Sequence, residues 1–268
     1  GRVPAANFSG PDRLLGAQIM AVSGPVARTM DDIALGLEAM SAQDLRDPWW
    51  VPVPLTLPPL PRRAALSTHP DGMETAPEIV AELTRAAEAL RAAGWVVEEV
   101  DIPPLRKAAQ QNILLWSGEM RRTGGKAIAD EDDPDANHVY KMLCEIAGPL
   151  TEETLLDAVQ YRVTLLREWQ AFLTEYPVLL CPVCGELPFP AHLDVESDAS
   201  FMRCYEAQLM QIGIPFLGLP GLTVTTGLVG RAPVGVQVIS GRYREDVMIE
   251  AGRIIEAAGT PPSPVDPA

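Results

Sequence analysis

Nucleophilic side chains with a neighbouring base would identify a hydrolase, because the attacking group must be activated. The sequence contains no G-x-S-x-G elbow and no Ser-x-x-Lys motif. Its three histidines, His69, His138 and His192, are scattered along the chain. The residues of a Ser-His-Asp triad come together only in the folded protein, so the sequence alone leaves the presence of such a triad open. We therefore predict no catalytic residue within these 268 residues.

Cys181 and Cys184 form a C-x-x-C motif, a pattern found in zinc sites and in redox centres. A structural zinc site needs four ligands, and only His192 lies nearby. The motif follows the apolar run 178–180, so we interpret it as the end of a buried strand. No metal and no cofactor are predicted. Four cysteines are too few for a disulfide scaffold, which favours a reduced, cytoplasmic protein.

Composition excludes some partners. The 21 basic and 36 acidic residues give a net charge of -15, which argues against nucleic acid. The longest apolar stretch, 212–229, is interrupted by glycines and prolines, and residues 1–20 lack the pattern of a signal peptide. We expect neither a nucleic-acid partner nor a membrane partner.

Hydrophobic spacing predicts alternating strands and helices. Thr29 is a good N-cap for the first clear helix, while the proline-rich stretch 47–61 cannot form a regular helix. Residues 63–100 then predict a strand, a helix capped by Thr75 and Glu78, and a second strand, which together form a βαβ unit.

The remaining elements follow the same alternation, and the class is α/β. The acidic run 130–135 is interpreted as a solvated loop, and residues 261–268 as a flexible tail. Helices are predicted over 105–122, 151–174, 199–211 and 244–258, and strands over 178–181, 222–226 and 233–239.

Several segments carry a family resemblance. Residues 24–34 (GPVARTMDDIA), with Asp47-Pro48, 176–182 (YPVLLCP), 218–224 (GLPGLTV) and 233–239 (PVGVQVI), resemble motifs of the amidase-signature family, in family order. The resemblance implies a large mixed sheet covered by helices on both faces. Residues 1–268 would be the C-terminal portion of one such domain.

The resemblance also implies where the chemistry lies. In that family a serine in a Gly-Ser-rich turn attacks the amide, and a second serine relays protons to and from a lysine. Gly1-Arg2-Val3-Pro4 resembles the segment that follows this region, which would place all three groups upstream of residue 1. No catalytic role is carried over to this chain.

Three residues are candidates for substrate binding. Trp116 and Asn112 lie on a segment that resembles the pocket-lining helix of the family; core packing and a surface position are the respective alternatives. Gln208 occupies the place where transamidase subunits carry an acidic residue, and Pro215 replaces the usual asparagine. Both departures favour a general amidase. Arg162 resembles a recurring arginine, with a solvated or a helix-packing role as its alternative.

These observations support three hypotheses. The first is a serine amidase that cleaves the C–N bond of a small carboxylic amide, with this chain alone inactive. The second is the glutamine-dependent transamidase subunit. The third is a non-catalytic fragment that only binds its missing half. We expect either that N-terminal half or self-association to cover residues 3–20 and 218–226.

Overall fold

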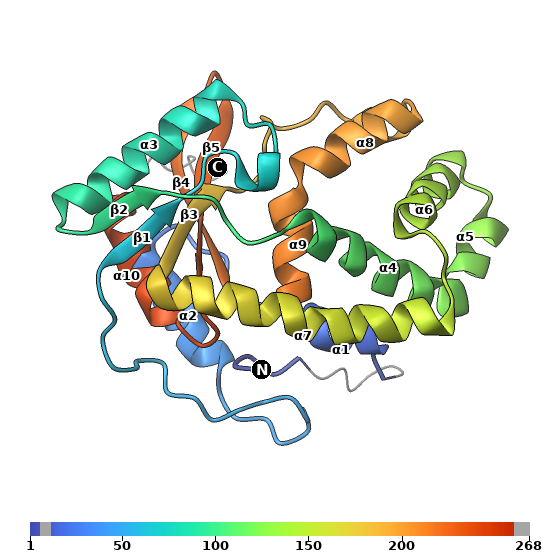
Figure 1. Cartoon of the computed structure of the whole chain (residues 1–268), viewed down its shortest axis with the longest axis horizontal. Coiled ribbons are helices and arrows are strands. Elements are labelled where there is room, and N and C mark those ends of the chain that lie inside the picture. The colour runs from blue at the N-terminus through green and yellow to red at the C-terminus, as the bar shows by residue number, and fades with distance from the viewer. Residues whose placement is uncertain (6–11, 260–268) are drawn as a thin grey trace, which may run out of the picture.

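The computed structural model describes residues 1–5 and 12–259 of the chain. A five-stranded mixed sheet with the order β2-β1-β3-β5-β4 lies between two groups of helices (Figure 1). The strands are β1 (Arg63–Leu66), β2 (Val96–Glu99), β3 (Val178–Pro182), β4 (Gly221–Val229) and β5 (Ala232–Ser240). The helices are α1 (Leu15–Met20), α2 (Met30–Met40), α3 (Pro77–Ala92), α4 (Arg106–Thr123), α5 (Gly125–Glu131), α6 (Pro134–Ala147), α7 (Glu152–Glu175), α8 (Asp198–Ala207), α9 (Leu209–Leu217) and α10 (Glu245–Ala257).

The predicted βαβ unit is confirmed: β1 and β2 pair in parallel, and α3 connects them. β3 also pairs in parallel with β1, whereas β5 runs antiparallel to both β3 and β4. The sheet is therefore mixed, as the family resemblance implied.

Each face of the sheet has its own apolar core. Ala64, Leu66 and Val178 belong to the cluster that packs against α3 and α10. Leu179 and Ile239 point to the opposite face, into the cluster formed with α4, α7 and α9. Because successive strand residues point to opposite faces, a buried strand such as β3 reads as a continuous apolar run. Helices thus cover both faces, as predicted.

Three local predictions were wrong. Thr75 does not cap α3: the N-cap is Ala76, with no side-chain bond, and Pro77 occupies the first turn. The single helix predicted over 199–211 is two helices, α8 and α9, that meet at Gln208. The acidic run 130–135 is exposed, as predicted, but it is not a loop: residues 130–131 end α5, and Asp133 caps α6 through the amides of Asp135 and Ala136.

Two other local predictions, on Thr29 and on the proline-rich stretch, were confirmed. The Thr29 side chain accepts a hydrogen bond from the Asp32 amide at the start of α2, and the proline-rich stretch forms no helix or strand. The predicted flexible tail, 261–268, lies outside the described residues. No helix in the described part is long and apolar enough to cross a membrane.

The contact between α4 and α9 depends on a glycine. A Cβ at Gly213 would collide with the Leu105 side chain and lie 3.2 Å from the Leu105 carbonyl oxygen. The Asn112 Nδ2 donates a 2.6 Å hydrogen bond to the Ile212 carbonyl in the same contact. Close approach of the two helices therefore requires a residue without a side chain at 213.

We expect Gly213→Val to lower the free energy of unfolding by about 2–3 kcal/mol, because overpacking a rigid contact strains the core. Urea unfolding monitored by circular dichroism measures the loss. Gly124→Val is the matched control, since a Cβ at that helix end meets only the flexible Met120 side chain within 3.4 Å. Equal stability of the two variants would contradict this role for Gly213.

Candidate functional site

The β4–β5 hairpin presents two different faces. Val224 and Val236 point to the buried face against α3 and α10. Thr223, which pairs with Gln237, and Thr225 point to the opposite face, where both threonines are exposed. The helices that cover this face of β3 therefore do not extend over β4.

α9 lies beside this uncovered face and adds two glutamines from its first turn. Gln208 is half-buried at the junction of α8 and α9, and its Nε2 donates to the Cys204 carbonyl at 3.1 Å. Gln211, later in the same turn, is exposed. The break between α8 and α9 at Gln208 is the feature that directs this turn toward the hairpin.

A cavity of about 390 Å³ lies between the start of α9, the hairpin and the segment after β3. Gln208, Gln211, Thr223 and Thr225 provide its polar groups, and Leu187 is among its apolar lining residues. We call this space the amide-lined cavity. Its carboxamides and hydroxyls donate and accept hydrogen bonds without carrying charge.

The charged group on the wall of this cavity is neutralised. Glu186 accepts hydrogen bonds from Arg203 on α8, at 2.8 Å from Nε and 2.6 Å from Nη2. The Arg203 guanidinium lowers the pKa of Glu186, which keeps the carboxylate ionised and paired. The cavity therefore suits an uncharged polar ligand.

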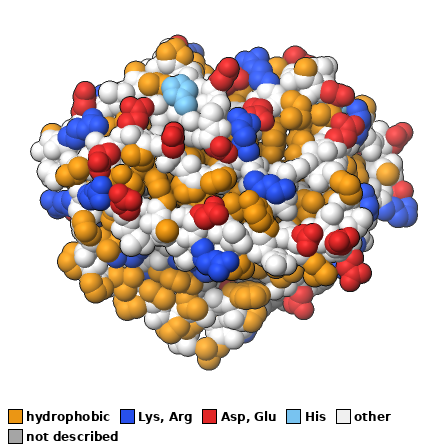
Figure 2. Space-filling model, in the orientation of Figure 1, with side chains coloured by type: hydrophobic (Ala, Val, Ile, Leu, Met, Phe, Trp, Pro, Cys, Tyr) orange, Lys and Arg blue, Asp and Glu red, His pale blue; other side chains and the backbone are white. Residues whose placement is uncertain are grey.

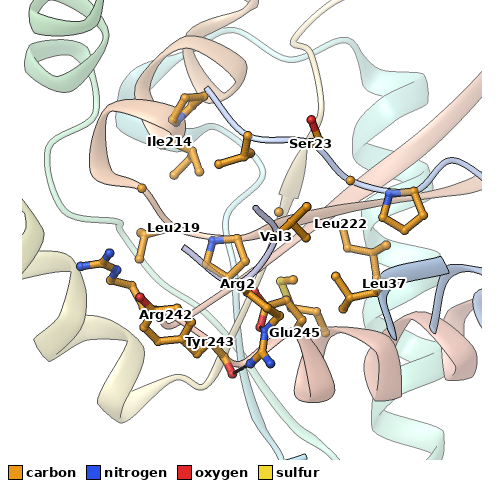
Figure 3. Close-up of a pocket in the computed structure, with 18 of the residues that line it drawn as sticks. Arg2, Val3, Ser23, Leu37, Ile214, Leu219, Leu222, Arg242, Tyr243 and Glu245 are labelled. Atoms are coloured by element: carbon orange, nitrogen blue, oxygen red, sulfur yellow. Dashed lines mark hydrogen bonds and ion pairs between the residues drawn. The ribbon is translucent and has the colours of Figure 1, made fainter. Parts of the chain in front are cut away.

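A second cavity, of about 410 Å³, adjoins the first at Gln211. The N-terminal segment, α2, α9, the start of β4 and α10 surround it, as Figure 3 shows. Leu37, Ile214, Leu219 and Leu222 give it apolar walls, and Arg242 lies at one side. We call it the apolar cavity.

Arg2 connects several segments beside the apolar cavity. This side chain is only 4% exposed, and its Nε donates to the Glu245 carboxylate at 2.9 Å. The Val53, Pro54 and Tyr243 carbonyls accept its remaining bonds at 2.8, 3.0 and 2.9 Å. One guanidinium therefore joins the N-terminus, the proline-rich segment and α10.

Arg162 fixes the end of α9. It donates to the Phe216 carbonyl and, at 3.3 Å, to the Ile19 carbonyl on α1. Burial lowers its pKa, and the nearby Arg242 lowers it further. Gly218, at φ 67°, ends the helix in the left-handed conformation, and its missing side chain leaves room for this guanidinium. The predicted helix-packing alternative for Arg162 is confirmed.

The predicted substrate residues lie in two places. Gln208 lines the amide-lined cavity. Asn112 is buried and bonded to α9, so it is not a surface residue. Trp116 is 38% exposed on α4, so it is not a core residue. Asn112 and Trp116 line neither cavity. Gln211, Thr223 and Thr225 of the amide-lined cavity and Gln237 of the apolar cavity were missed. The polar–apolar alternation of 222–225 was a signal for the two threonines.

The cysteine motif ends a buried strand, as predicted. Cys181 is fully buried in β3, and its thiol contacts the Gln237 carbonyl at 3.7 Å. Burial raises the pKa of both Cys181 and Cys184, so these thiols stay protonated and are weak nucleophiles. The described residues contain no group of three or more potential metal ligands.

Thr68, His69 and Glu99 form a triad-like cluster, and its geometry does not fit catalysis. The Thr68 hydroxyl lies 3.0 Å from His69 Nδ1, but it also donates to the Glu99 carboxylate at 3.0 Å. Thr68 is buried, and none of the three residues lines either cavity.

The lysines are also engaged away from the two cavities. Lys107 donates to the Gln110 side chain, and Lys126 pairs with Asp130 one helical turn away. Lys141 pairs with Asp198 on α8. None of the three lines either cavity, so no lysine is placed to act as a base there.

Sequence and structure comparisons agree on one family. The sequence profile described as Amidase matches residues 1–249. Indoleacetamide hydrolases of Bradyrhizobium diazoefficiens and Bradyrhizobium japonicum are 35% and 36% identical, each over 96% of this chain. These matches cover 50% and 56% of the relatives' own length, so the chain spans about half of each.

Solved structures give the same fold. A bacterial aryl acylamidase of the amidase-signature family superimposes with a TM-score of 0.71 at 21% identity, over 96% of this chain and 56% of its own. The 6-aminohexanoate cyclic dimer hydrolase gives a TM-score of 0.69 at 18% identity, over 87% and 53%.

Proposed function

This chain belongs to the amidase family, and we propose that the full-length protein hydrolyses the C–N bond of a small, uncharged carboxylic amide. The 268 residues form the C-terminal portion of one catalytic domain. A serine in the remainder of the polypeptide supplies the nucleophile, and the 268 residues alone are inactive. Ser23 lines the apolar cavity, and Thr223 and Thr225 line the amide-lined cavity, but no lysine or histidine lines either of them. The lack of such a base beside these hydroxyl groups supports this division.

The observation that carries the proposal is the similarity to indoleacetamide hydrolases. Identity of 35–36% over 96% of this chain is well above the 24% shared with a glutamyl-tRNA(Gln) amidotransferase component from Archaeoglobus fulgidus. We therefore propose an arylacetamide as substrate. A flat aromatic group and a primary carboxamide together need an apolar wall and a few placed polar groups.

The amide-lined cavity fits the carboxamide end of such a substrate. A primary amide has two N–H donors and one acceptor oxygen, and a glutamine side chain offers the matching groups. We assign Gln208 and Gln211 to holding the carboxamide, and the ionised Glu186 stays paired with Arg203. These residues bind and orient the amide, while bond cleavage belongs to the upstream serine.

The remaining predictions concern the transamidase hypothesis, the other two substrate-binding candidates and the localisation. Gln208 is neutral, which disfavours the transamidase hypothesis, because a donor ammonium needs a carboxylate partner. Trp116 and Asn112 remain proposed contributors to substrate binding, Asn112 through its bond to α9. The four unpaired cysteines support a reduced, cytoplasmic setting.

A charge substitution tests the amide-lined cavity. In the full-length enzyme we expect Gln208→Glu to lower kcat/KM for indoleacetamide about 10- to 100-fold, because a half-buried carboxylate loses part of its hydration and cannot donate to the amide oxygen. Gln208→Asn should lower kcat/KM by a smaller factor. Gln110→Glu, at a half-buried position of α4 that lines neither cavity, is the matched control. Unchanged kcat/KM in Gln208→Glu would contradict the assignment.

Ammonia release from a panel of arylacetamides by the full-length enzyme tests the reaction itself. Release that needs no tRNA or glutamine is the expected result. A requirement for both would favour the transamidase hypothesis instead.

A further inference from the structure

The solvent side of α7 carries one strip of exposed residues. Five exposed residues follow one another at intervals of three or four positions, which places them on one face of the helix: Glu152, Leu156, Gln160, Val163 and Arg167. We call them the α7 strip. α7 runs along the side of the molecule turned toward the viewer in Figure 1, and Figure 2 shows hydrophobic side chains between single charged groups on that side.

The apolar residues of the strip take no part in the core. Leu165, Trp169 and Leu173, on the opposite side of α7, are buried in the cluster formed with α4 and α9. Leu156 and Val163 are 64% and 54% exposed. Their transfer out of water would be favourable, and it requires a partner surface that approaches α7 from the solvent side.

The α7 strip is complementary to itself when its direction is reversed. Leu156 and Val163 have the same midpoint in the sequence as Glu152 and Arg167, just before Gln160. A second α7 that runs antiparallel across a two-fold axis at this midpoint therefore places the partner's Val163 opposite Leu156. The same axis places the partner's Arg167 opposite Glu152. Because a two-fold axis repeats each contact, two apolar contacts and two ion pairs form together.

The charged ends of the strip are available for this pairing. Neither Glu152 nor Arg167 forms an ion pair within the described part of the chain. Glu168 follows Arg167 but lies about 100° around the helix, on the flank of the strip. A parallel arrangement would bring like charges together at each end, so the charges favour the antiparallel one.

A groove extends the strip at the C-terminal end of α7. It has a volume of about 420 Å³, and its lining includes Gln170, Thr174 and the exposed Leu60. Gln170 shares the midpoint of the strip with Pro149, which is exposed just before α7 begins. The antiparallel arrangement therefore brings the partner's Pro149 to this groove, which adds an apolar contact at each end.

We propose that the α7 strip is the contact between two copies of this protein, which pair antiparallel across a two-fold axis beside Gln160. A contact built around one pair of helices about 36 Å long is small, so the dimer dissociates reversibly. This inference goes beyond the proposed amidase function and does not depend on it.

Cysteine cross-linking tests the orientation of the two copies. Leu156→Cys and Val163→Cys variants of the full-length protein are mixed and oxidised, and peptide mass mapping separates the new disulfide from native cysteines. The mixture should give at least about 10-fold more linked dimer than either variant alone. The reason is that two copies of position 156 lie about 10 Å apart along the helices, beyond the reach of a disulfide.

Val96→Cys is the matched control for this cross-link. Val96 is 55% exposed on β2, away from the α7 strip, so its mixture with Leu156→Cys should give no linked dimer above background. Equal yields from the Leu156→Cys and Val163→Cys mixture and from either variant alone would overturn the antiparallel pairing.

A charge exchange tests the pairing of Glu152 with the partner's Arg167. In sedimentation equilibrium of the full-length protein, Arg167→Glu should raise the dissociation constant of the dimer at least about 10-fold, because like charges then meet at both ends. Adding Glu152→Arg should return the constant to within about 3-fold of the unsubstituted protein, since both pairs are restored with their signs exchanged. Arg231→Glu, at the exposed β4–β5 turn, is the matched control and should leave the constant unchanged.

Recovery in the double variant would support the proposed register, because a local effect of either single charge would persist. A full-length protein that stays monomeric at about 100 µM would overturn the dimer. An unchanged dissociation constant in Arg167→Glu, or no recovery in the double variant, would reject the α7 strip as the contact.

Discussion

Arg2→Met should lower the free energy of unfolding of the 268-residue chain by about 3–5 kcal/mol, because it leaves a shielded carboxylate without its partner. Glu245 would lose the guanidinium that lies 2.9 Å from its carboxylate. The carbonyls of Val53, Pro54 and Tyr243 would lose their donor in the same step. Methionine fills much of the same volume, so the loss reports the polar network and not a cavity.

Urea unfolding of purified variants measures this effect. Arg2→Lys keeps the charge but cannot reach four acceptors with one ammonium, so an intermediate loss is expected. Arg122→Met is the matched control, because Arg122 is exposed near the end of α4, and it should change stability by less than about 0.5 kcal/mol. If Arg2→Met were as stable as Arg122→Met, the network would not hold the N-terminus in place.

The sequence predicted the elements that depend on local patterns. The spacing of Ile79, Leu83 and Leu90 predicts the buried face of α3, and all three are buried. The apolar run 178–180 similarly predicts a strand covered on both faces, which β3 is. Such patterns are readable because each element buries its own apolar face.

Features that depend on contacts between distant segments were not predicted from the sequence. The N-cap of α3, Ala76, provides no side-chain bond, and its amide donates to the distant Gly185 carbonyl at 2.8 Å. Helix propensity gave no reason to divide 199–211, and the division at Gln208 appears only when α9 packs against α4. In both cases tertiary contacts override the local preference.

The candidate site was predicted only in part. Gln208 was found through the family resemblance, whereas Gln211 and Gln237 were not. Gln237 shares a face with Thr223 because of the antiparallel register between β4 and β5. A one-residue shift in that register would reverse which side chains face the cavity. Sequence spacing within one strand cannot fix a register between two strands.

Hydrolysis of indoleacetamide by two forms of the protein tests the central claim most directly. The full-length enzyme should release ammonia, and the 268-residue chain, at equal concentration, should show no release above the uncatalysed rate. The physical reason is that the proposed amide-binding groups lie on this chain, whereas no lysine or histidine lies at either cavity to activate a nucleophile. Ammonia release by the 268-residue chain itself, abolished by a substitution within it, would contradict the account.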